Sequence, residues 1–236
     1  MNSRILLAVL PALGLAACAI VIDTHTGPLQ HDTVSVARDA SEYLRVNLTM
    51  GAGELKVSSG AAKFAEGTLT YNVDSWKPVV SYTAAAGHGN LDISQPGVHH
   101  GQAGNVKYQW DLRLANDIPL DLSVHFGAGD ASLNLGSLYL RSVDVEMGVG
   151  NLDMDLRGAP RRDYEVRVRG GVGEATIRLP HDAGVYAKAQ GGIGSVHSTG
   201  MRQEGDHLVN DAYDHSKASI HLDIQGGIGN INLLAD

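Results

Sequence analysis

The sequence has very little cysteine, and this limits how the fold can be stabilised. Cys18 is the one cysteine in 236 residues. A single thiol forms no disulfide within the chain and leaves no second cysteine for a thiolate metal site. The fold must therefore depend on packing and hydrogen bonds. Aromatic residues are also scarce, at 5%, whereas the 29 glycines favour a chain of many turns.

The sequence also lacks the common catalytic and cofactor motifs. It contains no G-x-S-x-G, S-x-x-K or H-E-x-x-H pattern and no phosphate loop. Paired carboxylates serve polysaccharide-cleaving β-helix enzymes, so the candidates for that role are Asp111, Asp117, Asp121, Asp130, Asp144, Asp153 and Asp155. Most of them alternate with apolar residues, which indicates a solvated strand face. We therefore expect no enzyme, no cofactor and no metal, with a polysaccharide-cleaving enzyme as a remaining alternative.

The first residues are typical of an export signal. Arg4 precedes an apolar run, and small residues follow before Cys18. The run is too short for a membrane span. The sequence Leu15-Ala16-Ala17-Cys18 resembles the lipobox of bacterial lipoproteins, which implies acylation of Cys18 and cleavage before it. Ala19 replaces the aspartate that would resemble an inner-membrane retention signal, so an outer membrane is favoured where the organism has two membranes.

A glycine pattern recurs through the rest of the chain. Seven copies share G-x-G, then a small polar or acidic residue, then alternating apolar positions, as in "MGAGELKV", "AGHGNLDI" and "MGVGNLDMDL". Alternating sequences such as "DYEVRVR" and "EATIRLP" flank the glycines and indicate half-buried strands. A repeat of about twenty residues cannot bury its apolar face alone, so the copies must stack. We predict an all-β, stacked-repeat, β-solenoid-like fold with glycine corners.

The glycines are interpreted as structural corners. The corner residues are Gly51, Gly53, Gly127, Gly129, Gly148, Gly150, Gly171, Gly173, Gly192, Gly194, Gly227 and Gly229. A calcium-binding nonapeptide needs an acid where three copies have Ala175, Val196 and Ile231. A dinucleotide-binding motif needs a third glycine and a following helix. Glycine at a corner instead permits positive φ or close approach of two backbones.

The repeat divides the chain into four parts. Residues 1–17 are the signal, 18–33 the lipidated N-terminus and tether, 34–118 the N-terminal part with insertions, and 119–236 the regular part. Pro78 lies in one insertion and indicates an edge or a cap rather than a central strand. Irregular segments of this N-terminal part carry four aromatic residues, Trp76, Trp110, Tyr82 and Tyr108. We expect them to pack in the core or a cap, and a possible binding surface for a sugar or a protein is the alternative.

Some acids and histidines are candidate cation ligands. Glu54, Asp130 and Glu174 follow their corners at equivalent positions and would form a row with weak affinity for cations, or a solvated face. His99 and His100 are adjacent, with His88 upstream. Adjacent histidines of a strand point to opposite faces, so a solvated pair is expected.

The run from Trp110 to Pro180, together with "MGAGELKV" and "EGTLTYNVDSWKPVVSYT", resembles the toast-rack family of bacterial envelope domains. That family is related to the C-terminal region of LiaF-like cell-wall-active antibiotic response proteins. The resemblance implies a stacked single-sheet fold and, for some relatives, a part in envelope-stress sensing. It carries over no catalytic residue. This sequence lacks the membrane helices that precede the domain in LiaF-like proteins, and a lipid anchor stands in their place.

These observations lead to one main hypothesis and two alternatives. The main hypothesis is a non-enzymatic, lipid-anchored bacterial envelope protein whose repeat binds another envelope protein or a glycan, with a link to envelope stress. A surface adhesin or glycan-binding module is the second hypothesis. The net charge of −8 argues against nucleic acid as a partner. Self-association is also possible, through an edge strand in the last residues, "GNINLLAD".

Overall fold

The structure is a computed structural model, and it describes residues 26–96 and 105–236. Within these ranges the chain is almost entirely β-strand, with one turn of 3-10 helix at Asp74–Trp76. The strands are β1 (Gln30–Val36), β2 (Tyr43–Ser59), β3 (Ala65–Tyr71), β4 (Val79–Ala85), β5 (His88–Ser94), β6 (Tyr108–Leu114), β7 (Leu120–Asn134), β8 (Leu140–Asp155), β9 (Tyr164–Leu179), β10 (Gly184–Thr199), β11 (Arg202–Glu204), β12 (His207–Val209) and β13 (Ser219–Ala235). The all-β prediction is confirmed. Cys18, His99 and His100 lie outside the described residues.

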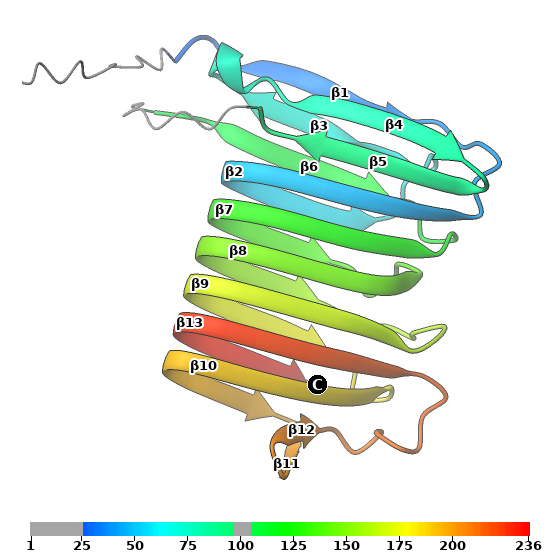
Figure 1. Ribbon diagram of the computed structural model, residues 1–236, viewed down its shortest axis with the longest axis vertical. Coiled ribbons are helices and arrows are strands. Elements are labelled where there is room, and N and C mark those ends of the chain that lie inside the picture. Colours follow the sequence, from blue (N-terminus) through cyan, green and yellow to red (C-terminus); the bar gives the residue numbers. More distant parts are fainter. Residues whose placement is uncertain (1–25, 97–104) are drawn as a thin grey trace, which may run out of the picture.

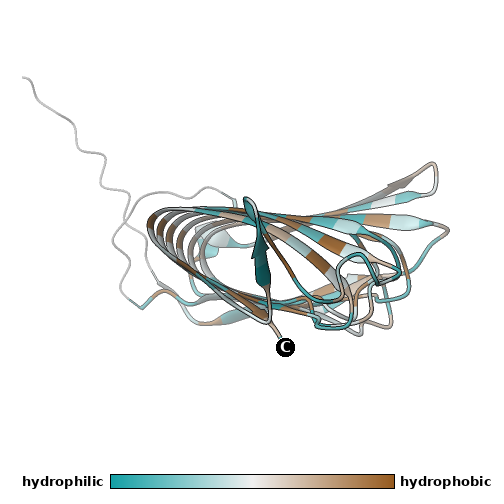
Figure 2. Ribbon diagram, turned by 90° about the horizontal axis from the view of Figure 1, so that it is seen from below, coloured by the Kyte–Doolittle hydropathy of each residue, from teal (hydrophilic) through white to brown (hydrophobic). Residues whose placement is uncertain are grey.

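Six long strands of 15 to 17 residues form the body of the molecule. Each one bends back on itself, and the six stack in parallel in the order β2, β7, β8, β9, β13, β10 (Figure 1). All described strands belong to one sheet, which is folded into two layers joined along the bends (Figure 2). The stacked-repeat architecture predicted from the glycine pattern is therefore correct.

The core lies between the two layers. Alternate residues of the long strands point inward and are almost fully buried, as Leu55, Leu133 and Ile177 illustrate, except in the second half of β10, where Val196 is 39% exposed. The intervening residues face solvent and are mostly polar, which gives the alternation of hydropathy along the strands in Figure 2. Period-two patterning places one set of side chains on one face because successive Cβ atoms of a strand point in opposite directions.

Each bend lies at a G-x-G pair, and the two glycines are required for different reasons. The second glycine has positive φ, as at Gly173, where φ is 147°. A Cβ added there would lie 1.7 Å from the carbonyl oxygen of Gly150 in the neighbouring strand. The first glycine is limited by crowding: a Cβ on Gly171 would lie 2.3 Å from the Gly148 oxygen. The second glycines of all six bends have positive φ, namely Gly53, Gly129, Gly150, Gly173, Gly194 and Gly229.

The copy of the pattern at Ala86 to Gly89 is not a bend, so the count of seven equivalent corners was wrong. Ala86 and Gly87, with φ of 50° and 78°, form the tight turn of the hairpin that joins β4 to β5. The sequence before this copy is another strand that pairs antiparallel with the sequence after it. A hairpin and a bend have the same alternating flanks, and therefore the pattern does not distinguish them.

Additional strands cover the N-terminal end of the stack. The first half of β2 pairs with β5, which pairs with β4, and its second half pairs with β6, followed by β3 and β1. The strand after Pro78, β4, pairs only with β5 among the described strands, which agrees with the edge position expected there. β1 begins at Gln30, so the sheet includes the last four residues of the expected tether, 18–33.

At the C-terminal end of the stack, the order of the strands in space differs from their order in the sequence. β13 lies between β9 and β10, and the four residues 180–183 carry the chain from β9 past that position to β10. The "GNINLLAD" segment is therefore paired on both sides, and the prediction that it forms an exposed edge was wrong. Instead, the second half of β10 is the edge: in the described part of the chain, its residues 195–199 pair with β13 alone.

Asn210 holds this crossover in place. Asn210 is only 2% exposed. The amide Nδ2 donates to the carbonyl oxygens of Ala183 at 2.7 Å and Pro180 at 3.1 Å. The amide Oδ1 accepts from the backbone N–H of Val185 at 2.9 Å. A buried amide with donors and acceptor satisfied fixes the connection in a single conformation.

We predict that Asn210→Ala lowers the free energy of unfolding by about 1–3 kcal/mol, because it leaves buried backbone groups of the crossover without partners. Urea denaturation followed by circular dichroism measures this change. Asn134→Ala is the matched control, since Asn134 is exposed at the end of β7. Equal stability of the two variants would contradict the proposed role of Asn210.

Two glycines in the bend of β9 are expected to respond oppositely to alanine. A Cβ at Gly170 meets no atom within 4 Å. Gly170→Ala should therefore raise the free energy of unfolding by about 0.4–1 kcal/mol, through reduced freedom of the unfolded chain. Gly173→Ala combines positive φ with a clash against backbone and should lower it by more than about 2 kcal/mol. Thermal denaturation of both variants tests the pair, and similar melting temperatures would be inconsistent with this account of the bends.

Candidate interaction surface

The aromatic residues predicted to form a binding surface lie mainly in the core. Trp110 is 1% exposed, and Tyr108 and Trp76 are also buried. Tyr108 packs edge-on against Trp76, with ring centroids 6.0 Å apart, and donates a hydrogen bond to the Trp76 carbonyl oxygen at 2.9 Å. Burial raises the pKa of Tyr108. Core packing is therefore confirmed for these three rings, and the alternative of a binding surface around them was wrong.

The reason is that β6 is an inner strand. It lies between β2 and β3, so the alternate residues Tyr108 and Trp110 point into the core. Tyr82 differs, because it is half-buried on the edge strand β4. Its hydroxyl donates to Asp39 Oδ2 at 2.8 Å. Tyr82 thus fastens a loop rather than forming a platform with the tryptophans.

The acidic row is interrupted by amides. Glu54 lies beside Asp130, but the next two strands place Asn151 and then Glu174 at the same position. Asn151 Nδ2 donates to Asp130 Oδ1 at 2.8 Å, and Glu174 accepts from Asn232 Nδ2 at 2.7 Å. These amide partners use carboxylate oxygens that a cation would need, so a continuous row of free acids is not formed.

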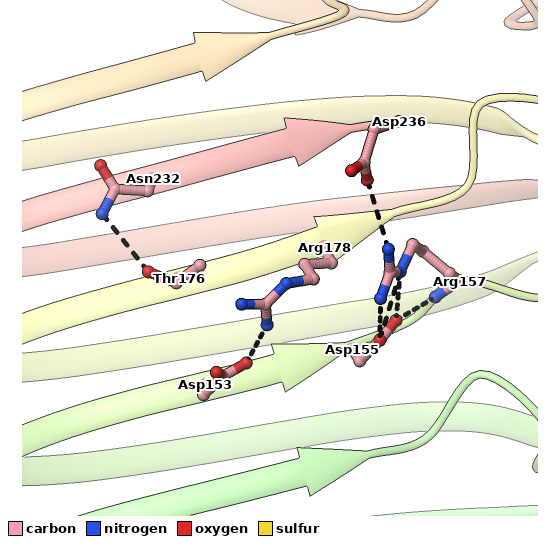
Figure 3. Close-up of polar contacts among 7 residues, drawn as sticks. All are labelled: Asp153, Asp155, Arg157, Thr176, Arg178, Asn232 and Asp236. Carbon is pink, nitrogen blue, oxygen red and sulfur yellow. Dashed lines mark hydrogen bonds and ion pairs between the residues drawn. The ribbon is translucent and has the colours of Figure 1, made fainter.

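The candidate catalytic carboxylates on β8 are paired with arginines (Figure 3). Asp153 accepts from Arg178 of the adjacent strand. Asp155 accepts from Arg157 Nη2 at 2.7 Å, and this hydrogen bond lowers the pKa of Asp155. Arg157 is also 3.7 Å from a carboxylate oxygen of Asp236, the last residue of the chain. A general acid needs a raised pKa, so this environment does not suit Asp155 to that role.

The described histidines do not assemble a metal site. Across residues 26–96 and 105–236, no group of three or more His, Cys, Asp or Glu side chains is placed to hold a metal ion. His88 instead stacks on Tyr43, with centroids 4.1 Å apart, and its Nδ1 is 2.9 Å from the Tyr43 hydroxyl. His88 therefore supports the junction between β5 and β2.

A cluster of four rings lies on the outer face at the C-terminal end of the stack. We call Tyr186, His207, Tyr213 and His221 the aromatic patch. Tyr186 on β10 is its centre: its ring centroid lies 4.4 Å from that of His207, 5.6 Å from His221 and 5.8 Å from Tyr213. The rings come from β10, β12, β13 and the loop between β12 and β13, so residues distant in sequence meet here.

Charged groups border the aromatic patch. Lys188 Nζ is 2.6 Å from Asp206 Oδ2, and His207 Nδ1 is 3.2 Å from Asp206 Oδ1. These hydrogen bonds, the one from Lys188 being the stronger, lower the pKa of Asp206 to about 2. Desolvation raises the pKa of Tyr213. Partly exposed rings with polar edges and nearby charges are typical of surfaces that bind proteins or sugars.

A second exposed feature follows the bends. The middle residues of four G-x-G pairs project outward and form what we call the bend ridge, namely Val149, Val172, Ile228 and Ile193. These side chains are 53%, 45%, 51% and 71% exposed. Adjacent members occupy paired positions on neighbouring strands, so they line up along the stack. An aligned row of exposed aliphatic side chains marks an interaction surface more often than isolated ones do.

Neither surface was predicted from the sequence. The bend ridge was detectable in principle, because the middle residue of the G-x-G is aliphatic at all six bends. The aromatic patch had no such signal, since its members are separated by up to 35 residues and meet only through the crossover to β10.

No helix in the described ranges has the length and apolar character to cross a bilayer.

Comparison with known proteins identifies the family. A sequence profile described as the N-terminal domain of toast_rack, DUF2154, matches residues 25–178. The chain belongs to the toast-rack family. The matched residues end within β9, so the crossover and the aromatic patch lie beyond this toast-rack match. No curated protein matches the sequence.

The toast-rack chain is also similar to solved structures. A "putative cell adhesion protein" from Clostridium sporogenes ATCC 15579 is 33% identical, and the alignment covers 89% of this chain and 100% of that one with a TM-score of 0.84. A "putative adhesin" from Bacteroides fragilis NCTC 9343 is 11% identical and covers 88% of this chain and 98% of that one. Its TM-score is 0.24, which is too low to support an inference. Neither protein carries the name of an enzyme.

The burial of Trp110 predicts that substitutions there alter stability rather than binding. Trp110→Ala should lower the free energy of unfolding by about 3–5 kcal/mol, because it leaves a cavity in the core. Trp110→Phe keeps a ring against Tyr108 and should cost less than half as much. Urea denaturation of both variants gives the comparison. An alanine variant as stable as the wild type would show that the residue is not part of the core.

Proposed function

We propose that this protein is a non-enzymatic, lipid-anchored module of the bacterial cell envelope that binds another envelope component through the aromatic patch. The observation that carries the proposal is the patch itself, where four rings from separate segments meet at the surface. Membership of the toast-rack family and the full-length similarity to a protein named for cell adhesion support a binding role.

Cys18 is the proposed site of the anchor. The sequence before it has the features of an export signal that ends in a lipobox, and the chain holds no other cysteine. Several acyl chains on one residue give stable attachment, whereas one chain alone is marginal. With Ala19 after the acylated cysteine, an outer membrane is the proposed destination in an organism with two membranes.

The geometry supports a binding role better than a catalytic one. Asp153 and Asp155, two of the candidate carboxylates, are bound to arginines. The remaining outward positions alternate regularly with the core and form solvated faces. The non-enzymatic function is thus proposed from how these groups are used, together with the name of the similar Clostridium sporogenes protein.

The partner is proposed to be a protein or a glycan of the envelope. Aromatic rings contribute strongly to protein interfaces and also stack on sugar rings. The glycan-binding alternative moves from the buried tryptophans to the aromatic patch, because that is where partly exposed rings gather. The stress-response role of some relatives applies here if the captured partner belongs to a signalling pathway.

The test is crosslinking in cells, followed by purification of the lipidated protein and mass spectrometry. We expect one recurrent envelope component, and we expect its yield to fall several-fold for the double variant Tyr213→Ala with His221→Ala. His181→Ala is the matched control, since this exposed histidine lies at the same end of the stack but outside the patch. Cys18→Ser removes the anchor and should also abolish capture. A glycan array with the same variants covers a sugar partner.

Capture that is equal for the wild type and the patch variants would overturn the role of the aromatic patch. Capture of crosslinked copies of the protein alone would favour self-association, for which the edge of β10 is the available strand. A hydrolytic activity of the purified protein that disappears with Asp153→Asn would refute the non-enzymatic function.

A further inference from the structure

We propose that the bend ridge rests on the lipid surface to which the protein is anchored, with its aliphatic side chains in the headgroup region of neutral lipids. The inference rests on the lipid anchor of the proposed function. It assigns an orientation: the stack lies along the membrane with its bends toward the lipid, and both outer faces and the aromatic patch stay accessible.

The size of the ridge side chains increases along the stack. The middle residues of the six bends are Ala52, Ala128, Val149, Val172, Ile228 and Ile193 in spatial order. Strands of a sheet are about 4.8 Å apart, so five spacings give a row of about 24 Å. The alanines lie at the N-terminal end of the stack and the isoleucines at the far end.

The described chain begins on the same side of the molecule as the bends (Figure 1). The backbone N–H of Gly27 donates to the carbonyl oxygen of Asn72 at 2.7 Å, and the backbone N–H of Asn72 donates to the carbonyl oxygen of Lys107 at 3.2 Å. Tyr108, which follows Lys107, lies directly beside the bend of β2, since a Cβ on Gly53 would be 2.3 Å from the Tyr108 carbonyl oxygen. The chain thus enters the fold at the alanine end of the row.

The tether is long enough for this edge to lie on the membrane. Cys18 and Thr26 are eight positions apart in the sequence. A fully extended segment of that length spans at most about 26–29 Å. An anchor joined to the fold at the alanine end, together with isoleucines at the other end, gives two points of attachment, and two points hold the row parallel to the lipid surface. The increase in side-chain size is in the direction that this arrangement requires.

The polar side chains beside the row are uncharged at the isoleucine end and charged toward the alanine end. At the isoleucine end, the flanking outward residues are uncharged: Gln225 and Asn230 on β13, and Gln190 and Ser195 on β10. Uncharged amides and hydroxyls enter a lipid headgroup region at a lower desolvation cost than charges do.

Toward the other end, charged side chains flank the row. Glu146 and Arg169 pair at 3.1 Å, and Glu174 lies on the opposite flank. On the same flank, β8 carries the amide Asn151, and the acids Asp130 and Glu54 follow on β7 and β2. Carboxylates near the surface repel anionic headgroups, so neutral lipids such as phosphatidylcholine are the proposed contact.

The shape of the ridge favours lipid over a folded partner. A single convex row of side chains between exposed glycines needs a matching groove in a protein, whereas a bilayer deforms around it without one. Aliphatic side chains that enter the boundary between headgroups and acyl chains gain the free energy of removal from water.

The experiment places a fluorescent probe on the ridge of the lipidated protein. Acylation consumes the Cys18 thiol, so Ile193→Cys provides a single site for an NBD label. Ile193 is exposed, and the substitution should leave the fold intact, which circular dichroism checks. The protein is reconstituted in phosphatidylcholine vesicles with and without a lipid that carries a doxyl quencher close to the headgroup. Asp182→Cys is the control, because Asp182 is exposed in the crossover on the opposite edge.

We expect a blue-shifted emission and several-fold stronger quenching for the label at residue 193 than for the label at residue 182, without dependence on salt. A second variant, Val172→Cys, should give an intermediate result, because the charged side chains of Arg169 and Glu174 lie close to that position. Equal, water-like emission at all three positions would overturn the ridge contact.

Mass spectrometry of the same samples separates this inference from the anchor. Diacylated Cys18 with a water-exposed label at residue 193 overturns the ridge contact and leaves the proposed function standing. A free Cys18 thiol in protein taken from membranes overturns the anchor, and the orientation falls with it.

Discussion

Close stacking of backbone at the bends is the constraint on which the rest of this toast-rack structure depends. The second glycine of each pair lies so near the strand beside it that an added Cβ would almost coincide with a carbonyl oxygen, as at Gly150 and Gly173. The same positions have positive φ. Crowding and backbone conformation therefore both exclude other residues. Because each bend is built against the previous one, the strands must stack in register.

The bend determines where side chains go. The two halves of each strand face one another, so their inward residues form one continuous core, from Leu55 at one end to Leu233 at the other. The middle residue of each bend has no core position to occupy and must project outward. An aliphatic residue there, such as Ile193, is not a failure of burial but the consequence of the corner geometry. The bend ridge and the core thus have the same origin.

At the C-terminal end, the last strand of the chain lies between two earlier strands. The crossover from β9 to β10 passes over the position of β13, and Asn210 secures it with hydrogen bonds to buried backbone groups. This arrangement brings Tyr186 and His221 onto neighbouring strands, where the β11–β12 hairpin adds His207. A patch of rings forms because the last strand inserts between two earlier ones. The family match ends at residue 178, before these elements.

Local sequence by itself determined the all-β fold, the stacked repeat and the use of glycine at its corners, because period-two burial and the steric needs of glycine act over a few residues. It did not determine which copy of the pattern was a hairpin, since Gly87 and a bend glycine have the same neighbours. Only the tertiary structure decided that Trp110 is in the core, that β13 inserts between β9 and β10, and that the aromatic patch exists. Each of these depends on which strands become neighbours, and that choice is made by long-range packing rather than by the residues on either side.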